Sequence, residues 1–351
     1  MNTDTDAMIQ ELSGQDIQEM LDSVLGDNSF SFTQYVSDIV NGKMHCSVQE
    51  AGNLLLQGLL SDLQQQKGMY LFILLLAVMG AVITNLSRLL QGKQVAETAF
   101  YGVYMLFFAV LTSAFAKVSL VAVGTLTDLV DFMKVLTPSY FISMTFAQGA
   151  TASTVYYEFF LVVITVANVL LVKLSIPVIH VFFLLKIANE LSEEEMFSKM
   201  AELLYDFLKM ALKTVLGIVM GINVIQGLIV PVSAEVERSV WVKAGSALPG
   251  VGNTISTVSG TLLCAARLVK NAVGITGVLA IVLLCGIPLL KLIVWKFGYQ
   301  LVAAVVQPVS DQRVIRCLGA VSQAVELLIR AVATGAMLFI LSILIICTMT
   351  T

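Results

Sequence analysis

Six runs of apolar residues dominate the chain after residue 68. A membrane-spanning α-helix needs about 20 mostly apolar residues to cross a hydrocarbon core of roughly 30 Å. Five of the runs are close to this length, and one is much longer. The predicted spans are 69–86, 99–123, 155–189, 214–230, 273–294 and 331–349.

Prolines interrupt the later apolar runs. All six prolines lie at or after Pro138. The run 155–189 would extend about 50 Å as one helix, so Pro177 is predicted to kink or divide it. Segments 138–153 and 297–308 are apolar but short. We predict re-entrant or interfacial helices there, because broken backbone at membrane depth must be covered by protein or line a cavity.

The first 68 residues have a different pattern, with apolar residues spaced among many acidic ones. This spacing predicts short amphipathic helices in an extramembrane region, 1–68, ahead of a membrane domain, 69–351. No basic segment followed by an apolar one opens the chain. Either a signal peptide has been removed, or the internal spans direct membrane insertion.

Two amphipathic segments interrupt the membrane domain, at 190–213 and 235–272. The first begins with a predicted capping box, Ser192 with Glu195. Its apolar face either packs on the rest of the chain or docks on the membrane surface or a partner. The second is too apolar for a free loop and too rich in hydroxyls for lipid. It is predicted to line a cavity or pack against identical copies. The apolar face of the first segment comprises Met196, Met200, Leu203, Phe207 and Ala211, opposite Lys199, Glu202, Asp206, Lys209 and Lys213.

Composition agrees with a membrane protein. Of the 351 residues, 58% are hydrophobic and 13% are charged, whereas soluble domains have about 45–50% and about 25%. The fold class is therefore all-α: a polytopic integral membrane protein with about six spans and additional interfacial or re-entrant helices. The net charge of −4 gives no indication of nucleic acid as a partner. The five cysteines form no CxxC pair and are predicted to be small core residues.

The distribution of positive charge sets the predicted orientation. With the N-terminus outside and six spans, inner loops contain more Lys and Arg than outer loops. The positive-inside rule favours this orientation.

A glycine-rich stretch, Pro249-Gly250-Val251-Gly252, raises the question of a nucleotide-binding loop. A P-loop requires Gly-Lys-Ser/Thr at its end, but Val251 follows Gly250. We predict instead a hinge between two amphipathic pieces, with Asn253 as a possible cap of the second helix.

Small residues mark two predicted packing faces. Ser256 and Gly260 lie on one helix face beyond the hinge, together with Cys264. Gly217 and Gly221 form a GxxxG pair in an apolar run, which permits close approach of two helices. Ordinary packing within the chain is the simpler interpretation of this pair.

Catalytic and cofactor sites are not predicted. Glu158 has no evident acid–base partner, and Lys173 is about 22 Å away along the same predicted helix. Two histidines are too few for a zinc cluster. Polar residues within the spans, such as Asn168, His180 and Asn223, more often hydrogen-bond neighbouring helices than relay ions. The sequence thus predicts no enzyme, no metal and no cofactor.

Several stretches resemble the stage III sporulation protein AE family of endospore-forming bacteria. They are ALPGVGNTISTVSGTLL, LVKNAVGITGVLAIVLLCGIPLLKL, AAVVQPVSD, and DFMKVLTPSYF followed by GATAS, with a weaker match at FSFTQYVSDIVNGK. The resemblance covers nearly the whole chain and carries over no catalytic residue.

The resemblance implies a structural component of a multi-protein channel in the mother-cell membrane that surrounds the forespore. The channel would resemble a secretion apparatus and be needed for late forespore gene expression. Implied partners are membrane lipids, other stage III channel proteins including a separate ATPase and a forespore-side protein, and further copies of this chain. The alternative is a stand-alone secondary transporter. Such a protein should have a repeat between its halves and a mid-membrane carboxylate, and the sequence indicates neither.

Overall fold

The computed structural model describes residues 14–25, 30–41, 67–82, 93–191, 196–246 and 252–349. The segments form helices joined by turns, without a β-strand in these ranges. The predicted all-α polytopic class is confirmed. The helices are α2 (Gly14–Leu25), α3 (Phe32–Val40), an unlabelled helix at Lys67–Val82, α5 (Lys93–Gln148), α6 (Ala150–Ala167), the π-helix η1 (Asn168–Ser175), α7 (Ile176–Leu191), α8 (Ser198–Ser246), α9 (Gly252–Val306) and α10 (Gln312–Met349).

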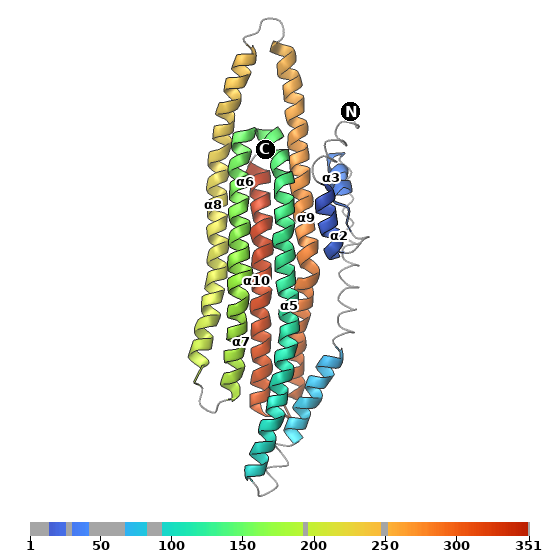
Figure 1. The fold of residues 1–351 in the computed structure, drawn as a ribbon, viewed down its shortest axis with the longest axis vertical. Helices are drawn as coiled ribbons and strands as arrows, with labels where there is room; N and C mark the ends of the chain where they lie inside the picture. The colour runs from blue at the N-terminus through green and yellow to red at the C-terminus, as the bar shows by residue number, and fades with distance from the viewer. Residues whose placement is uncertain are drawn as a thin grey trace.

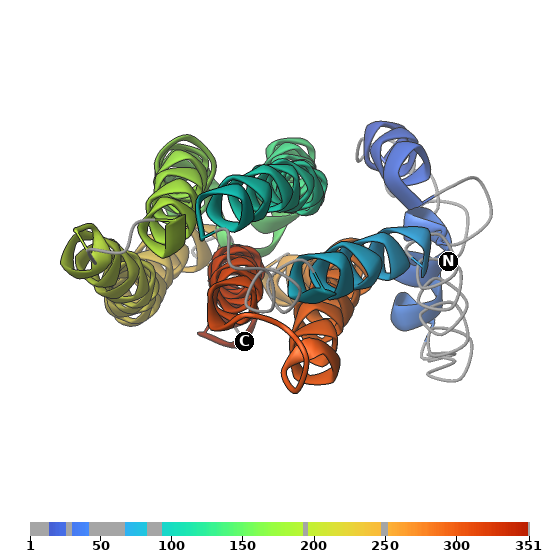
Figure 2. The ribbon, with the colours of Figure 1, turned by 90° about the horizontal axis from the view of Figure 1, so that it is seen from below.

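The long helices run up and down in one elongated bundle (Figure 1). α10 lies at its centre and packs against α5, α7, α8 and α9 (Figure 2). This position explains why α10 contains many fully buried small and branched residues, including Val321, Ala324, Leu328 and Val332.

Five helices in the described ranges are long and apolar enough to cross a membrane, and a sixth apolar helix, Lys67–Val82, is shorter. The sixth corresponds to the predicted span 69–86, of which residues 83–86 lie outside the described part. The five long candidates are Tyr101–Gln148, Ala150–Glu190, Ser198–Gln226, Leu263–Val306 and Gln312–Thr348.

The two predicted re-entrant segments are corrected by the structure. Residues 138–148 continue α5, with Pro138 inside the helix, and the chain reverses only at Gly149, whose φ is 92°. A positive φ of this size favours glycine, which has no Cβ to clash. Residues 297–306 likewise continue α9. Apolar segments too short to span a membrane alone are extensions of longer helices.

Pro177 does not divide the predicted span 155–189. Helical backbone continues from Ala150 to Leu191, and a π-helix at Asn168–Ser175 ends just before the proline. The Ser175 hydroxyl donates to the carbonyl oxygen of Leu170, five residues earlier, at 2.6 Å. A locally widened helix accommodates a residue that lacks an N–H donor without a break.

The segment 190–213 is not a separate interfacial helix, because α8 runs on from Ser198 to Ser246. The predicted capping box, Ser192 and Glu195, lies outside the described residues. α8 buries Ala201, Leu208 and Leu212. The predicted apolar face is largely exposed, since Met200 and Leu203 are 56% and 68% accessible. The apolar face is therefore not packed on the described part of the chain.

The N-terminal helices fulfil the predicted amphipathic pattern. Ile17 and Leu21 of α2 are fully buried, and Asp16 and Glu19 are exposed. The Gln18 side chain joins α2 to α3, because it donates to the carbonyl oxygen of Phe30 and accepts from the backbone N–H of Phe32, both at 2.8 Å. α2 packs on α5 and α9, and α3 packs on α9.

Candidate functional site

Four uncharged stretches lie at one level of the bundle. They are 159–172 in α6 and η1, 214–234 in α8, 271–290 in α9 and 331–349 in α10. Three contact groups fix their register. Asn223 donates to the Ser342 hydroxyl at 3.1 Å. A Cβ added at Gly277 would touch Leu136 and Ile343, and one at Gly335 would touch Leu126, Leu129 and Leu171. We call these four stretches the apolar layer.

The apolar layer ends at a positive charge on every one of its four helices. At about 1.5 Å per residue, the stretches of α8, α9 and α10 match a hydrocarbon core of roughly 30 Å, whereas the stretch of α6 and η1 is shorter, at about 21 Å. Cationic side chains at such a boundary can extend toward lipid headgroups while their stems remain apolar. The boundary residues are Lys173, Lys213, Lys291 and Arg330.

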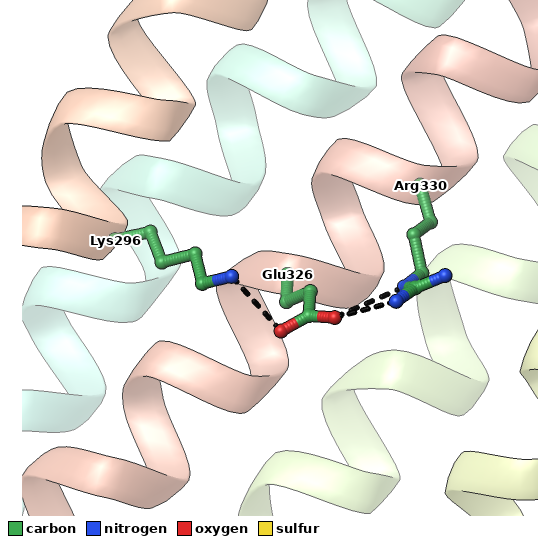
Figure 3. Close-up of polar contacts among 3 residues, drawn as sticks. All are labelled: Lys296, Glu326 and Arg330. Carbon is green, nitrogen blue, oxygen red and sulfur yellow. Dashed lines mark hydrogen bonds and ion pairs between the residues drawn. The ribbon is translucent and has the colours of Figure 1, made fainter.

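A three-residue ion cluster ties α9 to α10 at this boundary (Figure 3). Glu326 accepts from Lys296 Nζ at 2.9 Å, and its other oxygen accepts from Arg330 Nη2 at 2.7 Å and Nε at 3.2 Å. The exposed fractions of the three side chains are 24% for Lys296, 25% for Glu326 and 41% for Arg330. Arg330 also interacts with Tyr205 of α8. One carboxylate thus joins two helices and lies close to a third.

A second ion pair holds the lower end of α10. Arg316 Nε lies 2.5 Å from Glu190 Oε2 of α7, and the Glu190 side chain is only 10% exposed. Such charge-assisted contacts are stronger than neutral hydrogen bonds. The lower half of α10 is therefore tied by charge to two neighbouring helices.

Two tyrosine–cysteine contacts join α5 to α10. Tyr104 Oη lies 2.8 Å from Cys317 Sγ, and Tyr140 Oη lies 3.1 Å from Cys347 Sγ. Both cysteines are buried, as predicted for small core residues. The contacts occur near opposite ends of α10, so they fix the register of two helices that are far apart in sequence.

The hinge and packing residues predicted from the sequence lie mostly outside these contacts. Pro249 and Gly250 are outside the described residues. α9 begins at Gly252, which places Asn253 in its first turn rather than before it. Ser256 and Gly260 follow on the same helix.

Gly217 and Gly221 are on α8, and no atom of the described part of the chain lies within 4 Å of a Cβ added to either. Close approach within the chain occurs instead at Gly274, Gly277, Gly298 and Gly335. The sequence does not show which glycines contact another helix. Whether a glycine lies at a helix–helix contact depends on where the neighbouring helix packs.

The sequence pattern did not predict that three charged residues lie at the level of the apolar layer. Asp128, Asp131 and Lys134 follow the predicted span 99–123, but α5 continues past them. Leu129 contacts the Gly335 region and Leu136 contacts the Gly277 region, so the charges between them are level with the apolar layer. The apolar run ends near Val123, whereas the helix continues to Gln148.

A family profile described as Stage III sporulation protein AE matches residues 30–350. The chain belongs to the stage III sporulation protein AE family. It is also similar to the stage III sporulation protein AE of Bacillus subtilis (strain 168), with 25% identity over 312 residues that cover 89% of this chain and 78% of that protein. No solved structure matches the chain.

Membership in this family makes the chain a multi-pass membrane protein of sporulation. Its family name denotes a sporulation stage and no catalytic activity. In the described ranges, no group of three or more His, Cys, Asp or Glu is placed to hold a metal ion. The geometry of the described part is that of helices packed on a central α10, with a positive charge on each of four helices at one boundary of the apolar layer.

Proposed function

We propose that this protein is a structural membrane component of a multi-protein channel between mother cell and forespore, required for late forespore gene expression. Family membership supports a role in sporulation. The length of the helices supports a role in a multi-protein assembly. α5 has 56 residues and α9 has 55, so each is more than about 80 Å long, against a hydrocarbon core of roughly 30 Å.

Helices of this length extend beyond the membrane and provide surfaces for other proteins. Figure 1 shows α8 and α9 projecting past the other helices at one end. At the opposite end, below the apolar layer, α8 exposes Met200, Leu203 and Met210, and Met196 is exposed in the turn just before it. Flexible methionine-rich surfaces suit protein contacts. We assign these two ends to contacts with other channel proteins, including a separate ATPase and a forespore-side partner, and to contacts between copies.

The proposal includes no enzymatic activity of its own, because no acid–base pair, nucleotide loop or cofactor site supports one. Deletion of the gene in its native sporulating host should abolish heat-resistant spores and the activity of a late forespore reporter. Pull-down from sporulating cells should recover other stage III membrane proteins with the chain. Normal spore counts after deletion would refute the sporulation role. Solute transport by the purified chain alone in liposomes would favour the transporter alternative.

The cationic boundary of the apolar layer predicts the orientation. Lys173, Lys213, Lys291 and Arg330 mark the side that faces the mother-cell cytoplasm under the positive-inside rule. Because α2, α3 and the C-terminal end of α10 lie toward the other side (Figure 1), the N-terminal region should face the space between the two membranes. A reporter active only in the cytoplasm should give no signal when fused after Lys43, and a strong signal when fused after Asp311. A strong signal after Lys43 would reverse the orientation.

The hinge residues provide a separate test of assembly. Valine at Gly250 or Gly252 should reduce heat-resistant spores at normal membrane levels. The reason is that valine would have to adopt a backbone conformation that is accessible to glycine and strained for β-branched residues. Such strain costs about 1–3 kcal/mol. Valine at Gly260 should disturb packing and leave the turn unchanged. Spore counts and immunoblots of membrane fractions measure both effects. Normal sporulation of both hinge variants would make the segment an ordinary loop.

A further inference from the structure

The outward face of α5 contains an ion pair at the level of the apolar layer. Asp131 and Lys134 form a contact of 2.7 Å, one turn apart on the same helix. Leu129 and Leu136, on either side of them, reach Gly335 of α10 and Gly277 of α9. The pair is therefore level with the uncharged stretch 331–349 and far from either end of it.

Lipid is an unsuitable environment for these two charges. The side chain of Asp131 is 49% exposed and that of Lys134 is 52% exposed. Charged side chains inside a bilayer are costly and almost always face a bundle interior or a water-filled cavity. An ion pair within one helix leaves carboxylate lone pairs and ammonium protons that only water or other polar groups can satisfy.

The ion pair belongs to a continuous stripe on α5. Leu120, Gly124, Thr127, Asp131 and Lys134 follow one another at intervals of three or four residues, so they share one helix face. Leu120 is 70% exposed, Thr127 is exposed, and no atom of the described residues lies within 4 Å of a Cβ added at Gly124. The stripe is open along its length and carries mainly small or polar side chains.

Other outward faces at the same level are apolar. The exposed residues there include Ile218 and Ile225 of α8 and Met337 of α10, each more than half exposed. These faces have the composition expected against lipid. The α5 face is polar, whereas the other exposed faces at this level are apolar. This difference indicates that the α5 face does not contact lipid.

The polar face continues onto α6. Phe141 of α5 contacts Tyr157 of α6 with ring centroids 5.0 Å apart, and Glu158 and Thr165 of α6 are exposed. α5 and α6 lie side by side on the same side of α10 (Figure 2). Glu158 and Thr165 extend the polar positions from the level of the ion pair toward the Gly149 turn.

We propose that the outward face of α5 and α6, formed by Gly124, Thr127, Asp131, Lys134, Glu158 and Thr165, lines a water-filled path through the membrane. The inference rests on the proposed function as a channel component, because the described residues of one copy leave this face open and further subunits must enclose it. The path would admit water and hydrophilic solutes. The Asp131–Lys134 pair gives the path a charged section at the level of the apolar layer.

Thiol accessibility tests the inference directly. The background is the full-length chain with Cys46 and Cys264 replaced by serine and Cys285, Cys317 and Cys347 by alanine, shown to sporulate normally. Single cysteines are then introduced as Thr127→Cys and Gly124→Cys on the stripe, with Ile218→Cys of α8 as the matched apolar control. A charged, membrane-impermeant methanethiosulfonate is applied to membranes from sporulating cells. We expect the two stripe cysteines to react at least tenfold faster than the cysteine at position 218.

Two outcomes would overturn the inference. Equally slow reaction at positions 127 and 218 would place the stripe in lipid or in a dry interface. An oxidant-induced dimer linked through Thr127→Cys, without reagent access, would identify a contact between two copies. Neither outcome affects the proposed function, which fails separately if deletion of the gene leaves spore counts normal.

Discussion

Replacing Glu326 with alanine should destabilise the bundle by about 1–3 kcal/mol and reduce the amount of protein in the membrane. Loss of one partner from a fully buried ion pair costs about 3–5 kcal/mol, because the other charge stays buried and unpaired. The value is lower here because the three side chains are 24–41% exposed, and solvent screens part of the interaction. Lys296 and Arg330 would both lose the carboxylate that joins them.

The apparent melting temperature in detergent and the membrane level by immunoblot measure this effect. The matched control is Lys199→Ala, whose partner Glu202 lies 3.3 Å away with both side chains well exposed. That variant should melt like the wild type. A double variant, Glu326→Gln with Lys296→Met, should recover part of the stability, because the glutamine oxygen can still accept from Arg330 and no lysine charge is left unpaired. If Glu326→Ala also melts like the wild type, the cluster does not hold α9 to α10.

Substitutions at two glycines should have effects of opposite sign. A Cβ at Gly298 would lie 2.5 Å from Tyr70 Oη and 2.6 Å from Tyr70 Cζ. The tyrosine ring is rigid, so helix Lys67–Val82 must shift away from α9. Gly298→Ala should therefore destabilise the protein by about 1–3 kcal/mol, as overpacking does elsewhere. Gly217→Ala meets no described atom and should stabilise α8 by about 0.5–1 kcal/mol, because alanine loses less backbone entropy than glycine in a helix.

Thermal melting of the purified variants separates the two cases. Tyr70→Leu combined with Gly298→Ala should restore stability, since the smaller side chain leaves room for the new methyl group. A destabilised Gly217→Ala variant would reveal a close contact at that glycine. If Gly217→Ala has normal stability but no longer co-purifies with other proteins, Gly217 and Gly221 lie in an interface with another chain, as the GxxxG spacing predicts.

The sequence was sufficient for the class of the protein and for most of its helices. Apolar runs of about 20 residues define membrane spans without knowledge of any neighbour, because transfer from water to lipid depends on each segment's own surface. The family was also readable from glycine-, proline- and hydroxyl-rich stretches such as ALPGVGNTISTVSGTLL. The short amphipathic pattern around Ile17 and Leu21 correctly predicted a buried helix face.

Helix continuity required the tertiary structure. Pro138 and Pro177 are local signals for a break, yet both lie inside continuous helical backbone. At Pro138, packing of α5 against α9 and α10 outweighs the hydrogen bond that the proline cannot make. At Pro177, the preceding π-helix accommodates the proline. Charges ended the predicted span of α5 at residue 123 although the helix runs to Gln148.

The sequence by itself determined which segments are apolar, which helices they form and which family they belong to. Only the tertiary structure decided the register between helices, and with it which charges lie beside which apolar stretch. Asp131 and Lys134 are level with residues 331–349 because Leu129 and Leu136 meet Gly335 and Gly277. Lys296 meets Glu326 for the same reason. Periodicity is a property of one segment, whereas register depends on contacts between segments that are distant along the chain.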